Sequence, residues 1–425
     1  MFVEFVVGNY RSFKERQRLS MVASTNLESQ TGNQFETGFR IAPELLQSVC
    51  ILGPNASGKS NLVRAMDFLR DFATDSSKDL QEGDKIDVEP FKLSSKALSE
   101  PSEFEISFIV GETLYRYGLL ADKIRVHAEW LFSKSKEKGS QEREAFVRQY
   151  NPDSDSYTWR INTALLRGKR EQWKAATRSN ATFLSTAVQN NAADLKEPFN
   201  WLRVNFRPVL SVPALTPVYT FKILKEPEER AKILDFVKEI DLSISDIDVT
   251  EKEFDPNELS DNLPDAFRAE IIKEFSKKKF YVARPGHLDD EGNQIYFDFR
   301  DESDGTQIII ALAGPWLDVL ENGYAIIVDE LNNSLHPGAL RYLVELFHSP
   351  EHNKNNAQLI FVTHGTSVLA QQTMQRDQVW FMERTPQQST RLFPLTEFKP
   401  RKGEALEKGY LGGRYGALPN IKGFY

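Results

Sequence analysis

The sequence predicts an α/β fold with a mixed central sheet, an antiparallel β subdomain and a mainly helical inserted domain. An apolar run at 49–52 ends in a glycine-rich loop and is followed by an apolar pattern of helical period. Two later apolar runs, at 324–328 and 359–362, end in polar residues, as buried parallel strands do at their carboxyl ends. Residues 104–110 and 114–120 alternate with a period of two around a short turn, which is typical of an antiparallel hairpin.

The composition is that of an ordinary globular protein: 425 residues, of which 40% are hydrophobic and 27% are charged. This length is enough for two or three domains. The net charge of −8 argues against a generally basic surface that coats nucleic acid, although a local basic groove stays open. The one cysteine, Cys50, lies in an apolar run, so no disulfide within the chain is expected. Neither a signal-peptide pattern nor an apolar run of bilayer length occurs, so we expect a cytoplasmic protein without membrane contact.

The N-terminal residues predict a hairpin that leads into the core. Residues 2–7 are rich in β-forming side chains, and residues 8–13 turn the chain toward a second short strand at 18–23. A polar stretch at 24–48 separates this hairpin from the buried strand 49–52.

The loop after the buried strand fits the pattern GxxxxGK(S/T) of a phosphate-binding loop. Gly53 and Gly58 let the backbone curl, so that its N–H groups and the start of the next helix point at phosphates. Lys59 would reach the β- and γ-phosphates of ATP, and Ser60 would hold Mg²⁺. A fortuitous turn rich in Gly and Ser is the alternative, which the flanking strand and helix disfavour. The residues expected to bind the nucleotide here are Gly53, Pro54, Asn55, Ala56, Ser57, Gly58, Lys59, Ser60 and Asn61.

Helical periodicity then dominates from about 160 to 280, with apolar faces at 233–240 and 267–275. We therefore expect three segments: an N-terminal part over 1–130, a mainly helical insertion over 131–299 and a C-terminal part over 300–425. The most basic stretch of the insertion, Arg167–Lys174, is either a solvated helix face or a contact with nucleic acid or a partner, and the first is favoured.

Three later motifs lie where strands end or a helix begins. Ser303–Gln307 opens an apolar helix, the strand 324–328 runs into Asp329 and Glu330, and the strand 359–363 ends at His364. Asp329 is placed to organise Mg²⁺, and Glu330 could polarise an attacking water. His364 could reach a γ-phosphate. Taken singly, the acids could be a strand-end cap and the histidine could be satisfied locally, but their order and spacing favour a nucleotide site.

In this order the motifs resemble those of ABC-type ATPases, in the group with structural-maintenance-of-chromosomes (SMC) proteins and overcoming-lysogenization-defect nucleases. The resemblance implies an ABC-type P-loop ATPase head. In it Ser303–Thr306 matches the helix-opening ABC motif, Asp329–Glu330 the Walker B pair, Asn333–His336 the D-loop and His364 the switch histidine. A D-loop normally ends in aspartate, so His336 departs from the family pattern.

A closer resemblance is to bacterial AAA-type ATPases of anti-phage and abortive-infection systems. It rests on Asn9–Phe13, Asp329–Pro337 and Tyr410–Pro419, and it covers the insertion only weakly. The resemblance implies a homodimer, or a larger assembly of dimers, that sandwiches ATP and Mg²⁺. Ser303 and Gly305 of one subunit would close over the nucleotide bound by the other.

Three functions fit these observations. The favoured one is a defence ATPase that senses infection and controls a separate effector, a toxin or nuclease encoded nearby, with the insertion as its docking surface. The second is an SMC-like ATPase that repairs or organises DNA, which needs a long coiled coil or a basic groove that the sequence does not display. The third is an ATPase-coupled nuclease, which needs an additional acid cluster. Asp246 and Asp248 have suitable spacing, but surface acids are the better interpretation.

Overall fold

The computed structural model shows how the two ends of the chain build one sheet. It describes residues 1–25, 32–212, 216–240, 243–253, 264, 268, 271–273, 279–370, 373–401 and 403–418. Residue contacts divide the chain into a large unit and a small unit. The large unit comprises Met1–Ser211, Leu320–Asn332 and Leu343–Tyr425, and the small unit comprises Val212–Val319 and Asn333–Tyr342.

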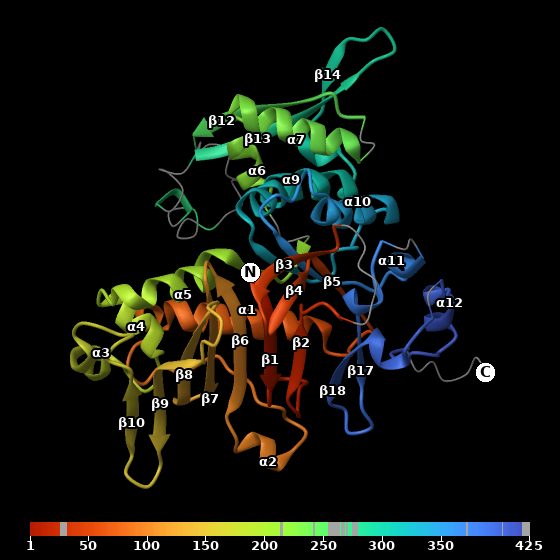
Figure 1. The fold of residues 1–425 in the computed structure, drawn as a ribbon. Helices are drawn as coiled ribbons and strands as arrows, with labels where there is room; N and C mark the ends of the chain where they lie inside the picture. Colours follow the sequence, from red (N-terminus) through yellow and green to blue (C-terminus); the bar gives the residue numbers. More distant parts are fainter. Residues whose placement is uncertain are drawn as a thin grey trace. The chain divides into compact units, whose positions relative to one another are not determined.

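A six-stranded mixed sheet forms the centre of the large unit (Figure 1). Its strands in spatial order are β11 (Phe206–Val209), β15 (Ala325–Val328), β16 (Gln358–Val362), β5 (Ser48–Leu52), β17 (Val379–Arg384) and β18 (Thr390–Pro394). All neighbours are parallel except β17 and β18. The four central strands, β15, β16, β5 and β17, consist of apolar residues over most of their length, since both faces of such a sheet are covered. The buried strands predicted from the sequence are confirmed.

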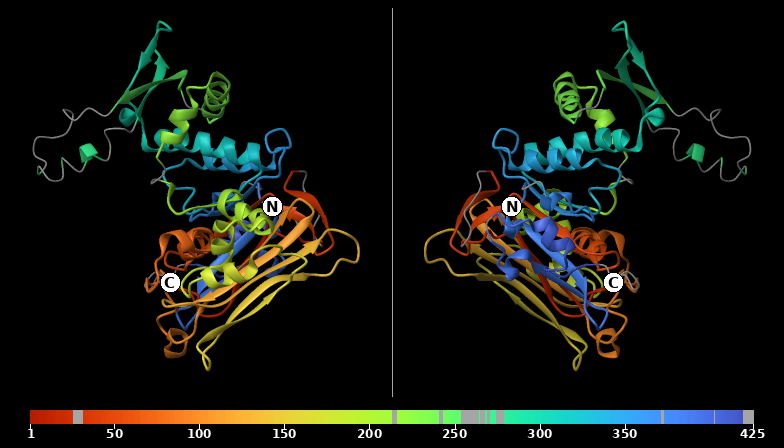
Figure 2. Two further views of the ribbon diagram at one scale, coloured as in Figure 1. Left: turned by 90° about the vertical axis from the view of Figure 1, so that its left-hand side faces the viewer. Right: turned by 90° about the vertical axis from the view of Figure 1, so that its right-hand side faces the viewer.

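A seven-stranded antiparallel sheet forms the second layer, and Figure 2 shows its long strands, orange to yellow, along one side of the large unit. Its strands in spatial order are β10 (Ser156–Ile161), β9 (Arg143–Asn151), β8 (Val126–Ser135), β7 (Thr113–Ala121), β6 (Ser102–Val110), β1 (Phe2–Gly8) and β2 (Gln17–Ser20). The hairpins predicted at 2–23 and 104–120 are confirmed. Helix α1 (Lys59–Asp79) contacts β1 of this sheet and β11 of the central sheet.

The remaining elements of the large unit are short. They include the hairpin β3 (Gln34–Phe39) and β4 (Ala42–Leu46), and the helices α2 (Ser95–Leu98), α3 (Arg170–Ala176), α4 (Phe183–Gln189), α5 (Lys196–Asn200), α11 (Ser367–Ala370) and α12 (Leu406–Leu411).

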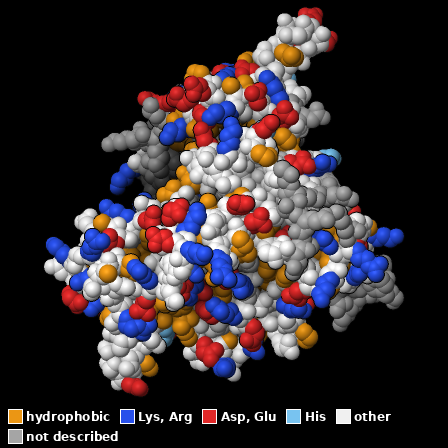
Figure 3. Space-filling model, in the orientation of Figure 1, with side chains coloured by type: hydrophobic (Ala, Val, Ile, Leu, Met, Phe, Trp, Pro, Cys, Tyr) orange, Lys and Arg blue, Asp and Glu red, His pale blue; other side chains and the backbone are white. Residues whose placement is uncertain are grey.

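One face of the antiparallel sheet carries paired charges. Glu105 bonds both Arg16, at 3.2 Å, and Arg116, at 2.9 Å, and Arg116 bonds Glu142 on the other side at 2.7 Å. In Figure 3 basic and acidic side chains are interspersed over the visible face of the molecule. Paired charges of both signs leave little net field, so this pattern does not resemble a nucleic-acid groove.

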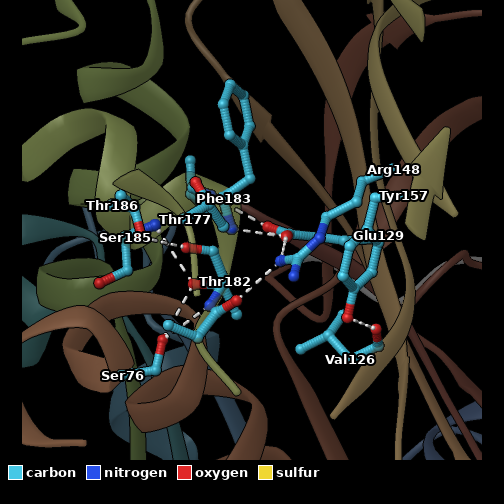
Figure 4. A network of polar contacts seen from close by, with 12 residues as sticks. Ser76, Val126, Glu129, Arg148, Tyr157, Thr177, Thr182, Phe183, Ser185 and Thr186 are labelled. Atoms are coloured by element: carbon cyan, nitrogen blue, oxygen red, sulfur yellow. Dashed lines mark hydrogen bonds and ion pairs between the residues drawn. The ribbon is translucent and has the colours of Figure 1, made fainter. Parts of the chain in front are cut away.

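A buried ion pair joins this sheet to α4 (Figure 4). Glu129 and Arg148 are both fully buried, and their charged groups lie 3.8 Å apart. Glu129 accepts backbone N–H bonds from Phe183 at 2.6 Å and Leu184 at 3.0 Å, and a hydroxyl bond from Tyr117 at 3.1 Å. Burial raises the pKa of Glu129, and the Arg148 charge and these donors oppose that shift.

Arg148 also forms hydrogen bonds on the other side of the pair, through both of its terminal nitrogens and not through Nε. Its guanidinium donates to the carbonyls of Ala181 at 2.8 Å and Arg178 at 2.9 Å, and it lies 4.0 Å from the centre of the Tyr157 ring. Removing either charged partner would leave an unpaired buried charge, which typically costs about 3–5 kcal/mol. The pair therefore ties strands β8 and β9 to the segment before α4.

The small unit combines a three-stranded antiparallel sheet with helices. The sheet comprises β12 (Asp246–Glu253), β13 (Lys279–Leu288) and β14 (Gln294–Tyr296). The helices are α6 (Val218–Ile223) and α7 (Pro227–Glu239), and α9 (Asp304–Asn322) and α10 (Pro337–His348) begin in this unit. The apolar face predicted at 233–240 is confirmed by the buried side chains of α7, whereas most of the pattern at 267–275, including Phe267 and Phe275, lies outside the described residues.

The middle of the chain contains more strand than the helical pattern predicts. Residues 143–161 form strands β9 and β10, so the segment 131–299 is not helical at its start, and β12–β14 add further strands. The compact units do not coincide with the segments 1–130, 131–299 and 300–425.

The basic stretch Arg167–Lys174 is largely used within the fold. Arg170 bonds the carbonyl of Leu166 at 3.0 Å, and Lys174 bonds Glu171 at 2.8 Å. These contacts support the interpretation as an ordinary helix surface.

A polar cluster closes the amino-terminal end of β5. His348 Nε2 lies 2.7 Å from the Ser48 hydroxyl and accepts a hydrogen bond from the Gln378 amide at 3.2 Å. Burial lowers the pKa of His348 from its ordinary value near 6.5 to about 4. With a pKa of about 4, the ring is neutral in the folded protein at pH 5 to 7. The unfolded chain, in contrast, takes up a proton at this histidine as the pH falls through about 6.5.

We expect acid to destabilise the protein through His348. As the pH falls from about 6.5 to about 4, the unfolded state binds a proton at this histidine that the folded state does not bind. This difference lowers the free energy of unfolding by about 2–3 kcal/mol. Chemical denaturation at pH 7 and pH 4.5 should give a smaller pH-dependent loss for His348→Gln than for the wild type. The exposed His352 supplies the control, since His352→Gln should keep the full loss. Equal losses in all three proteins would contradict the assignment.

Candidate functional site

The loop between β5 and α1 has the backbone of a phosphate-binding loop, which we call the P-loop (Gly53–Ser60). A Cβ on Gly53 would lie 2.2 Å from the carbonyl oxygen of Met382 in the adjacent strand β17. Gly58 has φ +107°, and a Cβ there would lie 2.2 Å from the Thr390 hydroxyl. Only glycine fits either position, so the sequence pattern is enforced by close packing as well as by the turn.

Lys59 folds back over this loop. Its ammonium group donates to the carbonyls of Gly53 at 2.7 Å and Pro54 at 2.8 Å. Burial lowers the pKa of Lys59 to about 8, while the carboxylates of Asp329 and Glu330 act in the opposite direction. The lysine thus lies at the loop, with both acids near enough to act on it electrostatically.

Asp329 follows β15 and is 5% exposed. Its Oδ1 is buried without a hydrogen-bond partner among the described residues. Burial raises the pKa of Asp329, and the neighbouring Ser60 hydroxyl opposes the shift. An unpartnered buried carboxylate oxygen is costly, and a carboxylate beside a hydroxyl is a suitable ligand set for Mg²⁺, so these residues fit the metal predicted from the sequence.

Glu330 and His364 face each other at the carboxyl ends of adjacent strands. His364 Nε2 lies 3.5 Å from Glu330 Oε1, and the two side chains are 35% and 47% exposed. Glu330 has φ +55°, a backbone conformation that non-glycine residues adopt only when the surroundings compensate the strain. This conformation comes directly after β15, at the residue whose side chain lies beside His364 and is exposed to water.

Asn332 links the two loops that carry these residues, and the sequence analysis assigned it no role. Its Oδ1 accepts hydrogen bonds from the Thr363 hydroxyl at 2.7 Å and from the backbone N–H of His364 at 3.4 Å. Leu331 N–H donates to the Val362 carbonyl at 3.2 Å in the same region. The acid pair and the histidine are thereby held in one network.

Ser12 and Thr390 support the P-loop from behind, and neither was expected to do so. Ser12 Oγ accepts from Asn61 Nδ2 at 2.9 Å and lies 2.9 Å from the Thr390 hydroxyl, which also reaches the Ser57 carbonyl at 2.8 Å. The motif Asn9–Phe13 therefore lies beside the P-loop.

Ser303 and Gly305 belong to the small unit, together with the D-loop motif. Ser303 caps α9, since its hydroxyl accepts the Thr306 N–H at 3.1 Å. A Cβ on Gly305 would lie 2.8 Å from the Ser334 carbonyl oxygen, so the two motifs touch through their backbones. A cavity of about 880 Å³ lies over them; it is lined by Glu239, Ile240, Ser303, Asp304, Gly305, Thr306, Ile309, Ser334, Leu335, His336, Gly338, Ala339 and Tyr342.

His336 has a structural role that accounts for its departure from the D-loop pattern. Its Nδ1 accepts the Gly338 N–H at 3.1 Å and so caps the start of α10, a task that aspartate also performs. This bond leaves the proton of a neutral ring on Nε2.

Residues 48–370 match the protein family described as "AAA domain, putative AbiEii toxin, Type IV TA system". The chain belongs to this family. The match spans the P-loop, Asp329, Glu330 and His364, so membership confirms the resemblance to AAA-type ATPases and agrees with the loop geometry. No match was found among the curated proteins. No helix in the described ranges is both long and apolar enough to span a bilayer.

Several solved structures are similar to this AAA-family chain at low identity. An SMC head bound to the C-winged helix domain of ScpA has 12% identity and a TM-score of 0.44, covering 92% of this chain and 96% of that one. The SMC head domain from Thermotoga maritima has 11% identity and a TM-score of 0.39, with 92% and 98% covered. The recombination mediator RecF with ATPrS has 13% identity and a TM-score of 0.31, with 92% and 98% covered. At these TM-scores we draw no argument from the likeness.

Proposed function

We propose that this chain is an ABC-type ATPase that hydrolyses ATP with Mg²⁺ and thereby controls a separate effector in anti-phage defence in the cytoplasm. One observation carries the catalytic part of the proposal. The P-loop lysine, an acid with an unpartnered buried oxygen, and a strained acid facing a histidine lie together at the carboxyl ends of β5, β15 and β16. This edge is where open α/β sheets bind their ligands.

Each residue has a distinct task in this proposal. The Lys59 ammonium exchanges the carbonyls of Gly53 and Pro54 for phosphate oxygens of ATP, which are stronger acceptors. Ser60 and Asp329 would hold Mg²⁺, which neutralises phosphate charge. Glu330 orients the attacking water and accepts its proton, and His364 donates toward the γ-phosphate.

The assembly part of the proposal concerns Ser303 and Gly305. The capped start of α9 presents backbone N–H groups and a positive helix end over a cavity, an arrangement that suits a phosphate. We assign this surface to the nucleotide bound by a second copy of the chain, so that a homodimer is the smallest active unit.

We propose that the ATPase acts on a separate protein partner. Among the described residues no cluster of acids, histidines or cysteines could hold a further metal ion. Asp246 and Asp248 are engaged by Arg230 and Arg284, as surface acids are, so the nuclease alternative gains no support. The small unit exposes apolar side chains on and beside β14, among them Leu288, Ile295 and Phe297, which supports this segment as a docking surface.

Substitutions of Lys59 and Glu330 should separate ATP binding from ATP hydrolysis. Lys59→Ala should weaken ATP binding, because the main contact to the β- and γ-phosphates is lost. Glu330→Gln should bind ATP but hydrolyse it at least about 100-fold more slowly, since the amide cannot accept the proton. Titration with ATP and steady-state phosphate release measure the two effects. A wild-type rate for Glu330→Gln would refute the role of that acid.

Mixed dimers test the shared site. Lys59→Ala and Ser303→Arg chains should each be inactive alone, whereas every mixed dimer keeps one intact composite site. Random mixing in equal amounts should restore roughly a quarter of the wild-type ATPase rate. If the mixture is no more active than its components, with both variants folded, the sandwich is wrong.

Co-expression with the neighbouring gene product tests the partner. A pull-down should retain that product, and Ile295→Glu in the small unit should release it because a charge enters the exposed apolar surface. Leu98→Glu provides the matched control, because Leu98 is an apolar residue of the large unit that is 55% exposed, against 44% for Ile295. Protection from phage by this chain alone, with all neighbouring genes removed, would overturn the partner assignment.

A further inference from the structure

A short segment near the end of the described chain, Glu404–Leu418, packs against the strand beside the P-loop strand. We call it the C-terminal clasp. Tyr410 of α12 stacks on Phe381 of β17 at 5.2 Å, and Tyr415 stacks on the same ring at 6.0 Å. Gly409 permits this packing, because a Cβ there would lie 2.8 Å from the Tyr415 hydroxyl. The clasp thus rests on the central sheet through aromatic contacts.

Polar bonds close the clasp on itself and on β17. The Tyr410 hydroxyl donates to the Ala417 carbonyl at 2.9 Å, and the Tyr415 hydroxyl donates to Glu404 at 2.6 Å. The Ala417 N–H donates to Glu383 of β17 at 3.1 Å, while Ala417 itself has φ +54°. A left-handed conformation at alanine persists only where several contacts hold it, so the clasp is a defined structure and not a loose tail.

One side chain of the clasp reaches the loop that carries His364. The Thr366 hydroxyl donates to Glu407 Oε1 at 2.6 Å, and α12 contacts α11, which begins at the next residue. On the other side, His364 is fixed by its bond to Asn332. Gly365 lies between the two anchors; its N–H donates to the Thr363 hydroxyl at 2.9 Å, and it has no side chain to restrict its backbone further.

We propose that Glu407 is a positioning residue for His364, an inference that rests on the proposed role of His364 in ATP hydrolysis. Without the Glu407 bond, the loop is held only before and at Gly365, by Asn332 and Thr363, so the segment after His364 is free and the orientation of the imidazole toward Glu330 is less well defined. With both anchors, the loop is held to the central sheet through Glu407, Tyr410 and Phe381. Tyr410 to Leu418, the described part of the motif noted in the sequence, would then support the ATPase site through the clasp, while Pro419 lies outside the described residues.

Steady-state ATP hydrolysis by the full-length protein tests this assignment. Glu407→Ala should lower kcat between about fivefold and about a hundredfold with little change in KM, because a misplaced group costs rate without costing ground-state binding. Glu407→Gln keeps an oxygen that accepts the Thr366 hydroxyl, so its kcat should stay within about twofold of the wild type. The double variant His364→Ala/Glu407→Ala should be no slower than His364→Ala, because the glutamate acts through the histidine.

Controls separate positioning from a general loss of structure. Glu397→Ala removes an exposed carboxylate that pairs with Arg391 and should leave kcat unchanged. Thr366→Val removes the same hydrogen bond from its other end, and should reproduce the kcat loss while Thr366→Ser does not. The thermal midpoints of all variants are recorded, and Thr366→Val replaces Glu407→Ala if the latter does not fold.

The possible results distinguish a failure of this inference from a failure of the proposed function. If His364→Ala slows hydrolysis but neither Glu407→Ala nor Thr366→Val does, the inference is wrong and the proposed function stands. A further loss of kcat when Glu407→Ala is added to His364→Ala also overturns it, since the glutamate would then act independently. If His364→Ala has the wild-type rate, the role of His364 in the proposed function fails and the inference falls with it.

Discussion

The position of β5 between β16 and β17 is the constraint on which the rest of the large unit depends. Cys50 pairs in register with Phe361 on one side and Val379 on the other, so a strand from the first eighth of the chain is completed by strands from its last quarter. Because these pairs are parallel, their carboxyl ends share one edge. The P-loop, the end of β15 and the His364 loop meet there for that reason alone. The tight approach of Gly53 to Met382 then fixes the loop against β17.

The parts of the fold that the sequence predicted are those with a strong local signal. The apolar strands 324–328 and 359–362 and the hairpin at 104–120 have clear periods, and no tertiary contact overrides them. Strand β10 alternates in the same way, with Tyr157, Trp159 and Ile161 on one face, and the prediction missed it, whereas β9 carries no such signal. Arg148 is fully buried, at a position where an alternating strand pattern would have an apolar residue. It is tolerated there because Glu129 and two carbonyl groups surround its guanidinium. That compensation comes from other segments and is invisible in the local sequence.

The site residues that were predicted also belong to a local sequence motif, and the unexpected ones do not. Lys59 and Ser60 were predicted because a motif of fixed spacing implies their task, and Asp329 because an acid at a strand end implies a ligand edge. Asn332, Ser12 and Thr390 have no motif of their own. Thr390 bonds Ser12 across 378 positions of sequence, at a point where β18 of the central sheet meets the turn between β1 and β2 of the other sheet. His336 shows a third case, where a departure from a pattern turned out to preserve a helix cap.

The two sheets of the large unit also differ in when they can form during synthesis. The antiparallel sheet is complete once residue 161 has emerged, because all its strands lie before that point. The central sheet has to wait for β17 at 379–384, roughly ten to fifty seconds later at ordinary translation rates. Until β16 and β17 have been made, β5 has neither of its two neighbours in the central sheet. The nascent chain therefore leaves the buried strand β5 without its neighbours for most of its synthesis, and the loops that carry Glu330 and His364 join the P-loop only late.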